Sequence, residues 1–170
     1  MLRRLGPELG FETTEVEPVQ IDGTTVSSTL IRQLVESGDL QATARFLGRN
    51  YSVLGTVVAG DGLGKKLGFP TANLAAHNEQ FPPDGVYAVR VHVGAELIPG
   101  VANIGSRPTV KTAGERLLEV HLLDFSGDLY GRDIEAEFLR FLRPEKKFPD
   151  VEALRGQIAL DVQSSRLMTA

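Results

Sequence analysis

The spacing of hydrophobic residues divides the chain into two parts that meet near residue 48. In the first part, Glu15 to Ile21 alternates enough to predict a strand, and Asp22-Gly23 predicts a turn after it. Two short helices are expected next, with boundaries marked by the hydroxyl run Ser27 to Thr29, Gly38, Asp39 and Gly48. One strand and two short helices bury too little apolar surface to form a core alone.

From Arg49 onward, hydrophobic residues recur mainly at every second position, which is the period of a strand. The predicted strands are Ser52–Ala59, Val86–Val93, Leu97–Ile104, Arg116–Phe125 and Asp133–Leu142. Pro99 and Gly100 suggest that the third of these is an edge strand or contains a bulge, and Gly127-Asp128 predicts the turn after the fourth. Short strands at regular spacing with few helices are typical of a small antiparallel barrel.

Helical spacing returns at the end of the chain. Asp150 is expected to be the N-cap of a last helix. Its predicted buried stripe is Val151, Leu154 and Ile158, extended by Val162.

Composition narrows the class of protein. A chain of 170 residues with 42% hydrophobic content can bury a core without disulfides, and the absence of cysteine excludes disulfides, zinc–thiolate sites and a cysteine nucleophile. The net charge of −4 disfavours general nucleic-acid binding, although a single small anion needs only local donors. No segment has the length and apolar content of a membrane span, so we expect a cytoplasmic protein with no membrane partner.

The glycine-dense loop Gly60–Gly68 is the first stretch with candidate chemistry. Glycines allow backbone N–H groups to approach phosphate oxygens, and Lys65 adds a positive charge. The spacing matches neither a Walker A loop nor a dinucleotide-binding loop, so from the residues alone a plain flexible hairpin loop is favoured over a phosphate cradle.

Pro70 follows this loop and restricts the backbone before Thr71 and Asn73. In an extended segment these two side chains share one face, and a hydroxyl and an amide oxygen are suitable ligands for Mg²⁺. The alternative, which the residues alone favour, is a polar turn at the start of a strand.

Several motifs occur in an order that resembles the riboflavin kinases, which exist as single enzymes and as the C-terminal module of bacterial bifunctional FAD synthetases. The motifs are Gly68–Asn73 (GFPTAN), Asn103–Thr109, Leu118–Phe125, Asp128–Gly131 and Phe141–Phe148. Together they cover nearly all of Arg49 to Val162. The resemblance implies a mainly β fold: a six-stranded antiparallel Greek-key barrel over Arg49 to Phe148, with a helix over Asp150 to Met168 packed outside it.

The resemblance also implies the domain organisation. Residues 1–47 resemble the end of an adenylyltransferase domain, in which Val26–Arg32 looks like its late phosphate-site motif, and residues 48–170 would be the kinase domain. The chain has no His-x-Gly-His run, which marks the nucleotide site early in that domain. We therefore expect a truncated bifunctional enzyme that keeps the kinase and lacks the adenylyltransferase.

The expected reaction transfers a phosphoryl group from Mg-ATP to riboflavin, giving FMN and ADP. By the resemblance, Thr71 and Asn73 bind Mg²⁺, and Glu119 is the catalytic base. The residues expected at the nucleotide are Gly60, Lys65, Gly68, Thr71, Asn73, Leu122, Asp124 and Tyr130, and those expected at the flavin are Arg143, Lys146 and Phe148.

Taken singly, some of these residues are equally compatible with structural roles. A carboxylate in an apolar strand is paired or functional, so Glu119 is either the base or the salt-bridge partner of Arg90 or Arg116. His121 is more typical of a hydrogen-bonded structural histidine. The basic run ending at Lys147 fits a solvated surface as well.

Two rival functions remain open. One is FMN adenylylation, using Ser27, Ser28 and Arg32, and the other is a non-catalytic flavin-binding barrel. The expected partners are ATP and riboflavin, with self-association or contact with the missing adenylyltransferase domain left open.

Overall fold

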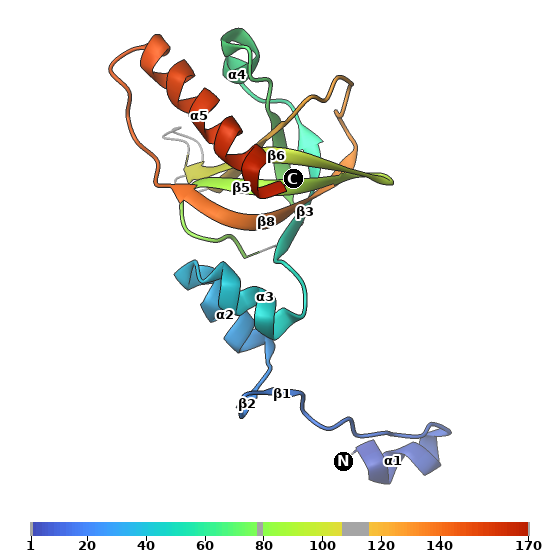
Figure 1. Cartoon of the computed structure of the whole chain (residues 1–170). Coiled ribbons are helices and arrows are strands. Elements are labelled where there is room, and N and C mark those ends of the chain that lie inside the picture. Colours follow the sequence, from blue (N-terminus) through green and yellow to red (C-terminus); the bar gives the residue numbers. More distant parts are fainter. Residues whose placement is uncertain (1, 78–79, 107–115, 170) are drawn as a thin grey trace.

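The computed structural model describes residues 2–77, 80–106 and 116–169. Six antiparallel strands close into a barrel in the order β3-β4-β7-β6-β5-β8. Their bounds are β3 Ser52–Val58, β4 Ala72–Ala76, β5 Gly85–Val93, β6 Glu96–Ser106, β7 Arg116–Leu122 and β8 Asp133–Arg143. In this order β7 lies between β4 and β6, so the connections are those of a Greek key, and the predicted barrel is confirmed (Figure 1).

The core lies inside the barrel and follows from the period-two pattern. Tyr87, Val89 and Val91 of β5 point inward, and Tyr87 packs edge-on against Phe138 of β8 with ring centroids 5.3 Å apart. On β7, Leu118 and Val120 are fully buried, while Glu119 between them and His121 after them face outward. The strand that carries the predicted base therefore presents one apolar face to the core and one polar face to the outside.

Helix α5, Val151–Thr169, packs across the outside of β5 and β6 (Figure 1). Asp150 caps it, since its Oδ1 accepts from the N–H of Ala153 at 2.7 Å. The predicted buried stripe is partly wrong: Val151 is exposed, whereas Asp161 and Ser165 are buried. Because both buried polar side chains form hydrogen bonds with the barrel, an apolar period could not reveal them.

Residues before the barrel form separate short elements. They are α1 Leu2–Leu9, β1 Gln20–Ile21, β2 Thr24–Thr25, α2 Ser28–Ser37 and α3 Leu40–Leu47. The N-cap residues Ser27 and Asp39 and the left-handed glycines 38 and 48 are as predicted. Helices α2 and α3 lie under one end of the barrel, while α1 lies away from it (Figure 1).

Three other local predictions need correction. Glu15 to Ile21 is not one strand, because only Gln20–Ile21 pairs, in a two-residue ladder with β2. The loop Gly60–Gly68 contains a short helix, α4 Leu63–Leu67, that begins and ends at left-handed glycines. Strand β7 ends at Leu122, before Phe125, because the chain turns at Asp124, which has a φ of 56°.

The prediction of an edge strand or a bulge at Pro99 and Gly100 is wrong, because the barrel is closed and β6 pairs with β5 through both residues without a register shift. Strand β6 pairs with β7 only from Gly100 onward, so Pro99 lies just beyond that ladder. A missing N–H is tolerated there because no strand partner requires it. Among the described helices, none combines the length and apolar content needed to cross a bilayer.

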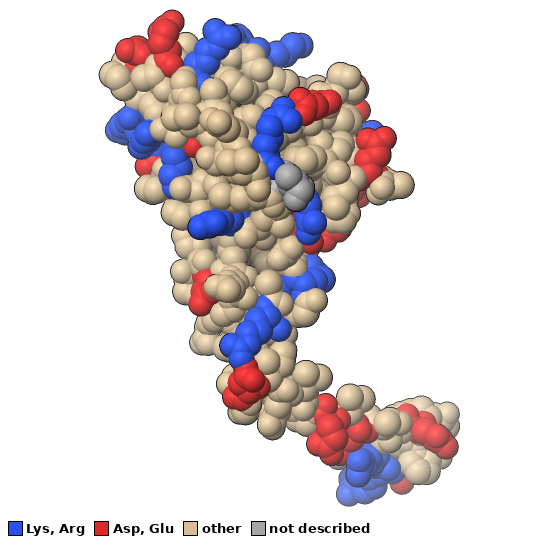
Figure 2. All heavy atoms as spheres, viewed as in Figure 1, with Lys and Arg blue, Asp and Glu red and all other residues tan. Residues whose placement is uncertain are grey.

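Acidic and basic side chains are interspersed over the face of the molecule drawn in Figure 2. Mixed charge of this kind provides no extended phosphate-binding surface on that face. Any anion site on that face must consequently be local.

Candidate active site

Three polar side chains form a row across the outer face of neighbouring strands. In the ladder between β4 and β7, Asn73 lies directly opposite Glu119, and between β7 and β6 Glu119 lies opposite Asn103. Opposed residues in an antiparallel pair have Cβ atoms about 4.5–5.5 Å apart and on the same face. The closed barrel thus groups a carboxylate between two amides, although these residues are far apart in the sequence.

Asn73 sits at one end of this row under the glycine loop. Its side chain is buried, and its Oδ1 has no hydrogen-bond partner among the described residues. Gly60 lies directly on the amide, because a Cβ at Gly60 would come within 2.1 Å of Asn73 Nδ2. A buried amide oxygen without a partner is costly in an apo fold, so this atom fits a ligand that supplies a positive charge or a donor.

The oxygen donors of Thr71 and Asn73 therefore fit Mg²⁺, which prefers hard ligands. Among the described residues, no group of three His, Asp or Glu side chains could hold a metal ion. A cation at Thr71 and Asn73 would then take its remaining ligands from water and from phosphate oxygens.

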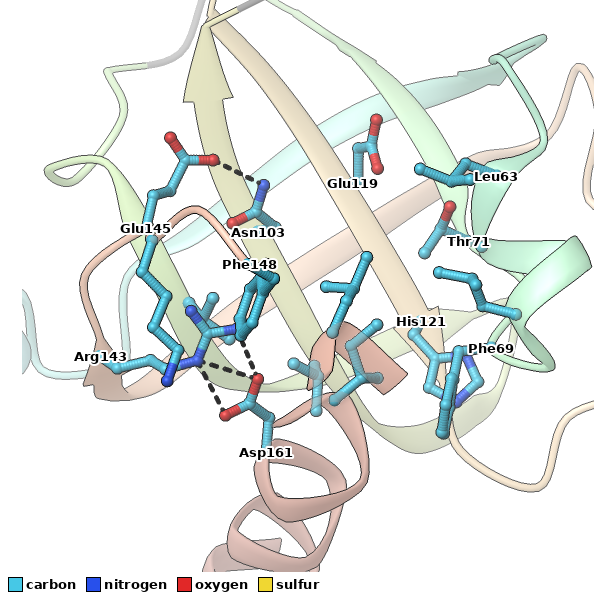
Figure 3. Close-up of a pocket in the computed structure, with 17 residues that line it drawn as sticks. Leu63, Phe69, Thr71, Asn103, Glu119, His121, Arg143, Glu145, Phe148 and Asp161 are labelled. Carbon is cyan, nitrogen blue, oxygen red and sulfur yellow. Dashed lines mark hydrogen bonds and ion pairs between the residues drawn. The ribbon is translucent and has the colours of Figure 1, made fainter. Parts of the chain in front are cut away.

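Thr71 lies where two pockets meet. The first pocket has a volume of about 360 Å³, within the range of small-molecule sites. Leu63, Phe69 and Thr71 line one side, Arg143 and Phe148 line the opposite side, and Glu119 lies between them (Figure 3). Helices α4 and α5 supply part of the apolar wall, including Leu67, Leu154 and Ile158.

The second pocket, of about 260 Å³, lies on the other side of Thr71. Its lining includes Lys65, Leu122 and Tyr130, together with Val57 and Phe125. Four residues predicted at the nucleotide, Lys65, Thr71, Leu122 and Tyr130, are therefore brought together here. Glu119 and the three residues predicted at the flavin are brought together in the first pocket.

The four other residues predicted at the nucleotide, Gly60, Gly68, Asn73 and Asp124, line neither pocket. Gly60 packs on Asn73, as described above, and Gly68 ends α4 with a φ of 87°. Asp124 binds Arg166 of α5 through two hydrogen bonds of 2.6 and 2.8 Å. The hydrogen bond from Arg166 is the main cause that lowers the pKa of Asp124 below its ordinary value.

The three residues predicted at the flavin contact one another, and Arg143 also bonds helix α5. The Arg143 guanidinium binds both carboxylate oxygens of Asp161, and it lies 5.7 Å from the ring centroid of Phe148. Lys146 Nζ lies 5.1 Å from the same centroid. Two neighbouring side chains therefore each place a cation near the Phe148 ring, which lines the first pocket.

The structure bears on the structural roles that the sequence left open for Glu119 and His121. Arg90 pairs with Glu137 at 2.8 Å and Arg116 pairs with Asp84, so both proposed partners of Glu119 bind other carboxylates. His121 forms a hydrogen bond of 2.7 Å between its Nδ1 and the carbonyl of Pro70. This structural role holds the segment that leads into Thr71.

Two residues at the site were missed from the sequence. Asn103 was seen only as part of a motif, and its place beside Glu119 depends on strand register. Asp161 was missed because it interrupts an apolar helical stripe. The neighbouring Arg107, Pro108 and Thr109 of the same motif as Asn103 lie outside the described residues.

The site thus combines a closed Greek-key barrel with two adjoining pockets that share Thr71. The chain belongs to the riboflavin kinase family: residues 47–169 match the family model described as Flavokinase, riboflavin kinase.

Curated relatives match this chain over nearly its whole length. It is 42% identical over 169 residues to a bifunctional riboflavin kinase/FMN adenylyltransferase of Pseudomonas fluorescens, covering 99% of this chain and 54% of that protein. It is 41% identical over 167 residues to the protein of the same name in Escherichia coli K12, covering 98% of this chain and 53% of that one. The chain thus spans about half the length of these curated relatives.

A solved structure supports the fold. A chain from Streptococcus pneumoniae, whose structure is titled as a macrolide-efflux protein, superposes with a TM-score of 0.78 at 32% identity. The match covers 95% of this chain and 53% of that one.

Proposed function

We propose that this chain is a riboflavin kinase that transfers the γ-phosphoryl group of Mg-ATP to the 5′-hydroxyl of riboflavin. The observation that carries the proposal is that two pockets share Thr71, with Glu119 inside one of them. An apolar first pocket suits a flat aromatic ring system, and the second pocket contains Lys65 for phosphate charge. Family membership supports the choice of substrates.

In the proposed mechanism, the riboflavin 5′-oxygen attacks the γ-phosphorus while Glu119 accepts the hydroxyl proton. The bond from the γ-phosphorus to the bridging oxygen breaks, and ADP leaves with that oxygen. Such reactions depend mainly on positioning and charge neutralisation, with one carboxylate orienting the attacking hydroxyl. Mg²⁺, held by Thr71 and Asn73 with the phosphates, would neutralise the charge of the phosphate oxygens.

The proposal is tested by incubating the protein with riboflavin and Mg-ATP and separating the flavins by chromatography. We expect FMN and ADP to form in equal amounts, and chelation of the metal to stop the reaction. Riboflavin binding without ADP release would instead support the non-catalytic barrel.

We further propose that residues 1–47 correspond to the end of the adenylyltransferase part of the bifunctional relatives, and residues 48–170 to their kinase part. The support is that the relatives match nearly all of this chain, including residues before the kinase family match. The exposed apolar side chains Leu2, Leu9, Val16 and Val19 fit a surface that contacts the rest of that domain. Incubation with FMN and Mg-ATP should yield no FAD, and FAD formation would favour the rival assignment to Ser27, Ser28 and Arg32.

A further inference from the structure

A buried carboxylate on α5 ties the wall of the first pocket to the helix. The Asp161 side chain is only 5% exposed. Its two oxygens accept three hydrogen bonds from Arg143, two from Nε at 3.0 Å and one from Nη2 at 2.8 Å (Figure 3). Arg143 is the last residue of β8, so this contact fixes the point where the chain leaves the barrel and begins the segment 144–148.

A second branch extends from the same carboxylate. Gln157, one turn earlier on α5, donates from Nε2 to Asp161 Oδ1 at 3.0 Å. The Oε1 of Gln157 accepts from Lys146 Nζ at 2.6 Å. Asp161 therefore holds Arg143 directly and Lys146 through Gln157.

Both cations that Asp161 holds are placed at Phe148. The guanidinium carbon of Arg143 and the Nζ of Lys146 lie 5.7 and 5.1 Å from the ring centroid. Cations within about 6 Å of an aromatic face are attracted by the ring, and they restrict its position. The ring lines the first pocket, so its orientation determines the shape of that wall.

The need to attach α5 to the barrel does not by itself explain why a carboxylate is buried at Asp161, because other residues of the helix also bond the barrel side of the molecule. Ser165 bonds the carbonyl of Gly100 at 2.7 Å, and Arg166 bonds Asp124, both outside the first pocket. A buried ion pair is weak evidence for stability, because well-packed apolar side chains often serve as well. The pair at Asp161 lies instead where a pocket wall needs a fixed geometry.

We propose that Asp161 is a positioning residue for the flavin, because it sets the Phe148 ring through Arg143 and Lys146. This inference rests on the proposed function, in which the first pocket takes riboflavin. Asp161 acts through its neighbours, so its loss should affect riboflavin binding and leave nucleotide binding unchanged.

The test replaces Asp161 with Asn, which keeps the shape and removes the charge. Riboflavin affinity, measured from quenching of flavin fluorescence, should fall about tenfold or more, as expected when a charge-assisted contact is lost. KM for riboflavin should rise with it, while KM for ATP stays within about twofold, a difference too small for the loss of one hydrogen bond. Ser165→Ala is the matched control, since it loosens α5 away from the pocket and should lower the melting temperature without changing riboflavin affinity.

Gln157→Ala removes the branch that links Asp161 to Lys146 and leaves the pair of Asp161 with Arg143 in place. This variant should weaken riboflavin binding by roughly three- to tenfold, which is the effect of losing one hydrogen bond. If Asp161→Asn does not fold, the riboflavin affinity of Gln157→Ala tests the positioning role in its place. Unchanged riboflavin affinity in the folded variant, or an equal loss in Ser165→Ala, overturns the proposal.

The two proposals fail differently. If the wild-type protein binds riboflavin without phosphorylating it, the proposed reaction is wrong, but the affinities still test Asp161. If it does not bind riboflavin at all, amide hydrogen exchange over residues 145–149 decides: faster exchange in Asp161→Asn than in Ser165→Ala supports the positioning role, and equal exchange overturns it.

Discussion

The two pockets that meet at Thr71 are built differently. The wall of the first pocket consists of side chains bonded to one another and to α5, such as Arg143 with Asp161. The second pocket is lined by more exposed groups, including Tyr130, which is 67% exposed. A fixed apolar wall suits a rigid aromatic substrate. Phosphate groups instead need positive charge and backbone N–H groups that can approach their oxygens. Under the proposed function, riboflavin specificity and nucleotide binding should therefore be separable, and only a residue that lines both pockets, such as Thr71, should act on both.

The largest effect is expected in the first pocket, from Glu119→Gln. The variant keeps the shape of the side chain but removes the base, and general-base contributions are typically about 10²–10⁴-fold. Turnover should fall by that factor while the affinity for Mg-ATP barely changes, as measured by FMN formation and nucleotide titration. A variant that melts like wild type and keeps turnover within a few-fold would remove Glu119 from the mechanism.

Thr71→Val should rank second and should affect the nucleotide as well. It keeps the β-branched shape but loses the side-chain oxygen of a residue that lines both pockets, so Mg-ATP affinity and turnover should both fall by roughly 10- to 100-fold. Initial rates over a range of ATP and Mg²⁺ concentrations measure the effect, with a thermal melt as the control for folding. Loss of turnover at unchanged Mg-ATP affinity would mean that Thr71 does not contact the metal–nucleotide complex.

A pair of variants, one in each pocket, tests whether riboflavin binding and nucleotide binding are independent. Phe148→Ala should raise KM for riboflavin about tenfold, because it removes an aromatic wall, and leave KM for ATP unchanged. Lys65→Ala should do the reverse with a smaller change of about three- to tenfold, since it removes one exposed charge. If either variant raised both KM values equally, the pockets would not be independent.

The smallest effect is expected at Asp124, whose carboxylate is bonded to Arg166 outside both pockets. Asp124→Asn should change KM for ATP by less than about threefold. The pKa of Asp124 is lowered in the folded state, so its contribution to stability is present above its ordinary pKa and is lost as the pH falls through the lowered value.

Urea unfolding between about pH 2 and 5 should therefore show a slightly steeper acid loss in wild type than in Asp124→Asn, because carboxyl groups of this kind titrate in that range. A large rise in KM for ATP in the variant would instead assign Asp124 to the nucleotide, as the family resemblance implies.

Much of the fold was predictable because buried positions recur at every second residue on strands such as β3 and β7. The predicted strand Val86–Val93 lies within β5, and its alternate residues Tyr87, Val89 and Val91 form part of the core. Helix α4 was missed because five residues between glycines give no period. The predicted strand at Glu15 to Ile21 was wrong because local alternation does not supply a pairing partner.

The candidate site was predictable only in part. Lys65 and Phe148 were singled out through motifs, and the structure places them in separate pockets. The row of Asn73, Glu119 and Asn103 depends on register between three strands, which one sequence does not reveal. Asp161 was hidden for the same reason: its partner Arg143 lies on another element.

The most direct test of the two-pocket account is a crystal structure of the protein with Mg-ADP and riboflavin. The account predicts the isoalloxazine ring against Phe148 in the first pocket and the nucleotide beside Lys65 in the second. The riboflavin 5′-hydroxyl should lie within hydrogen-bond distance of Glu119, and the metal should contact Thr71 and Asn73. Both ligands in one pocket, or a 5′-hydroxyl directed away from Glu119, would contradict the account.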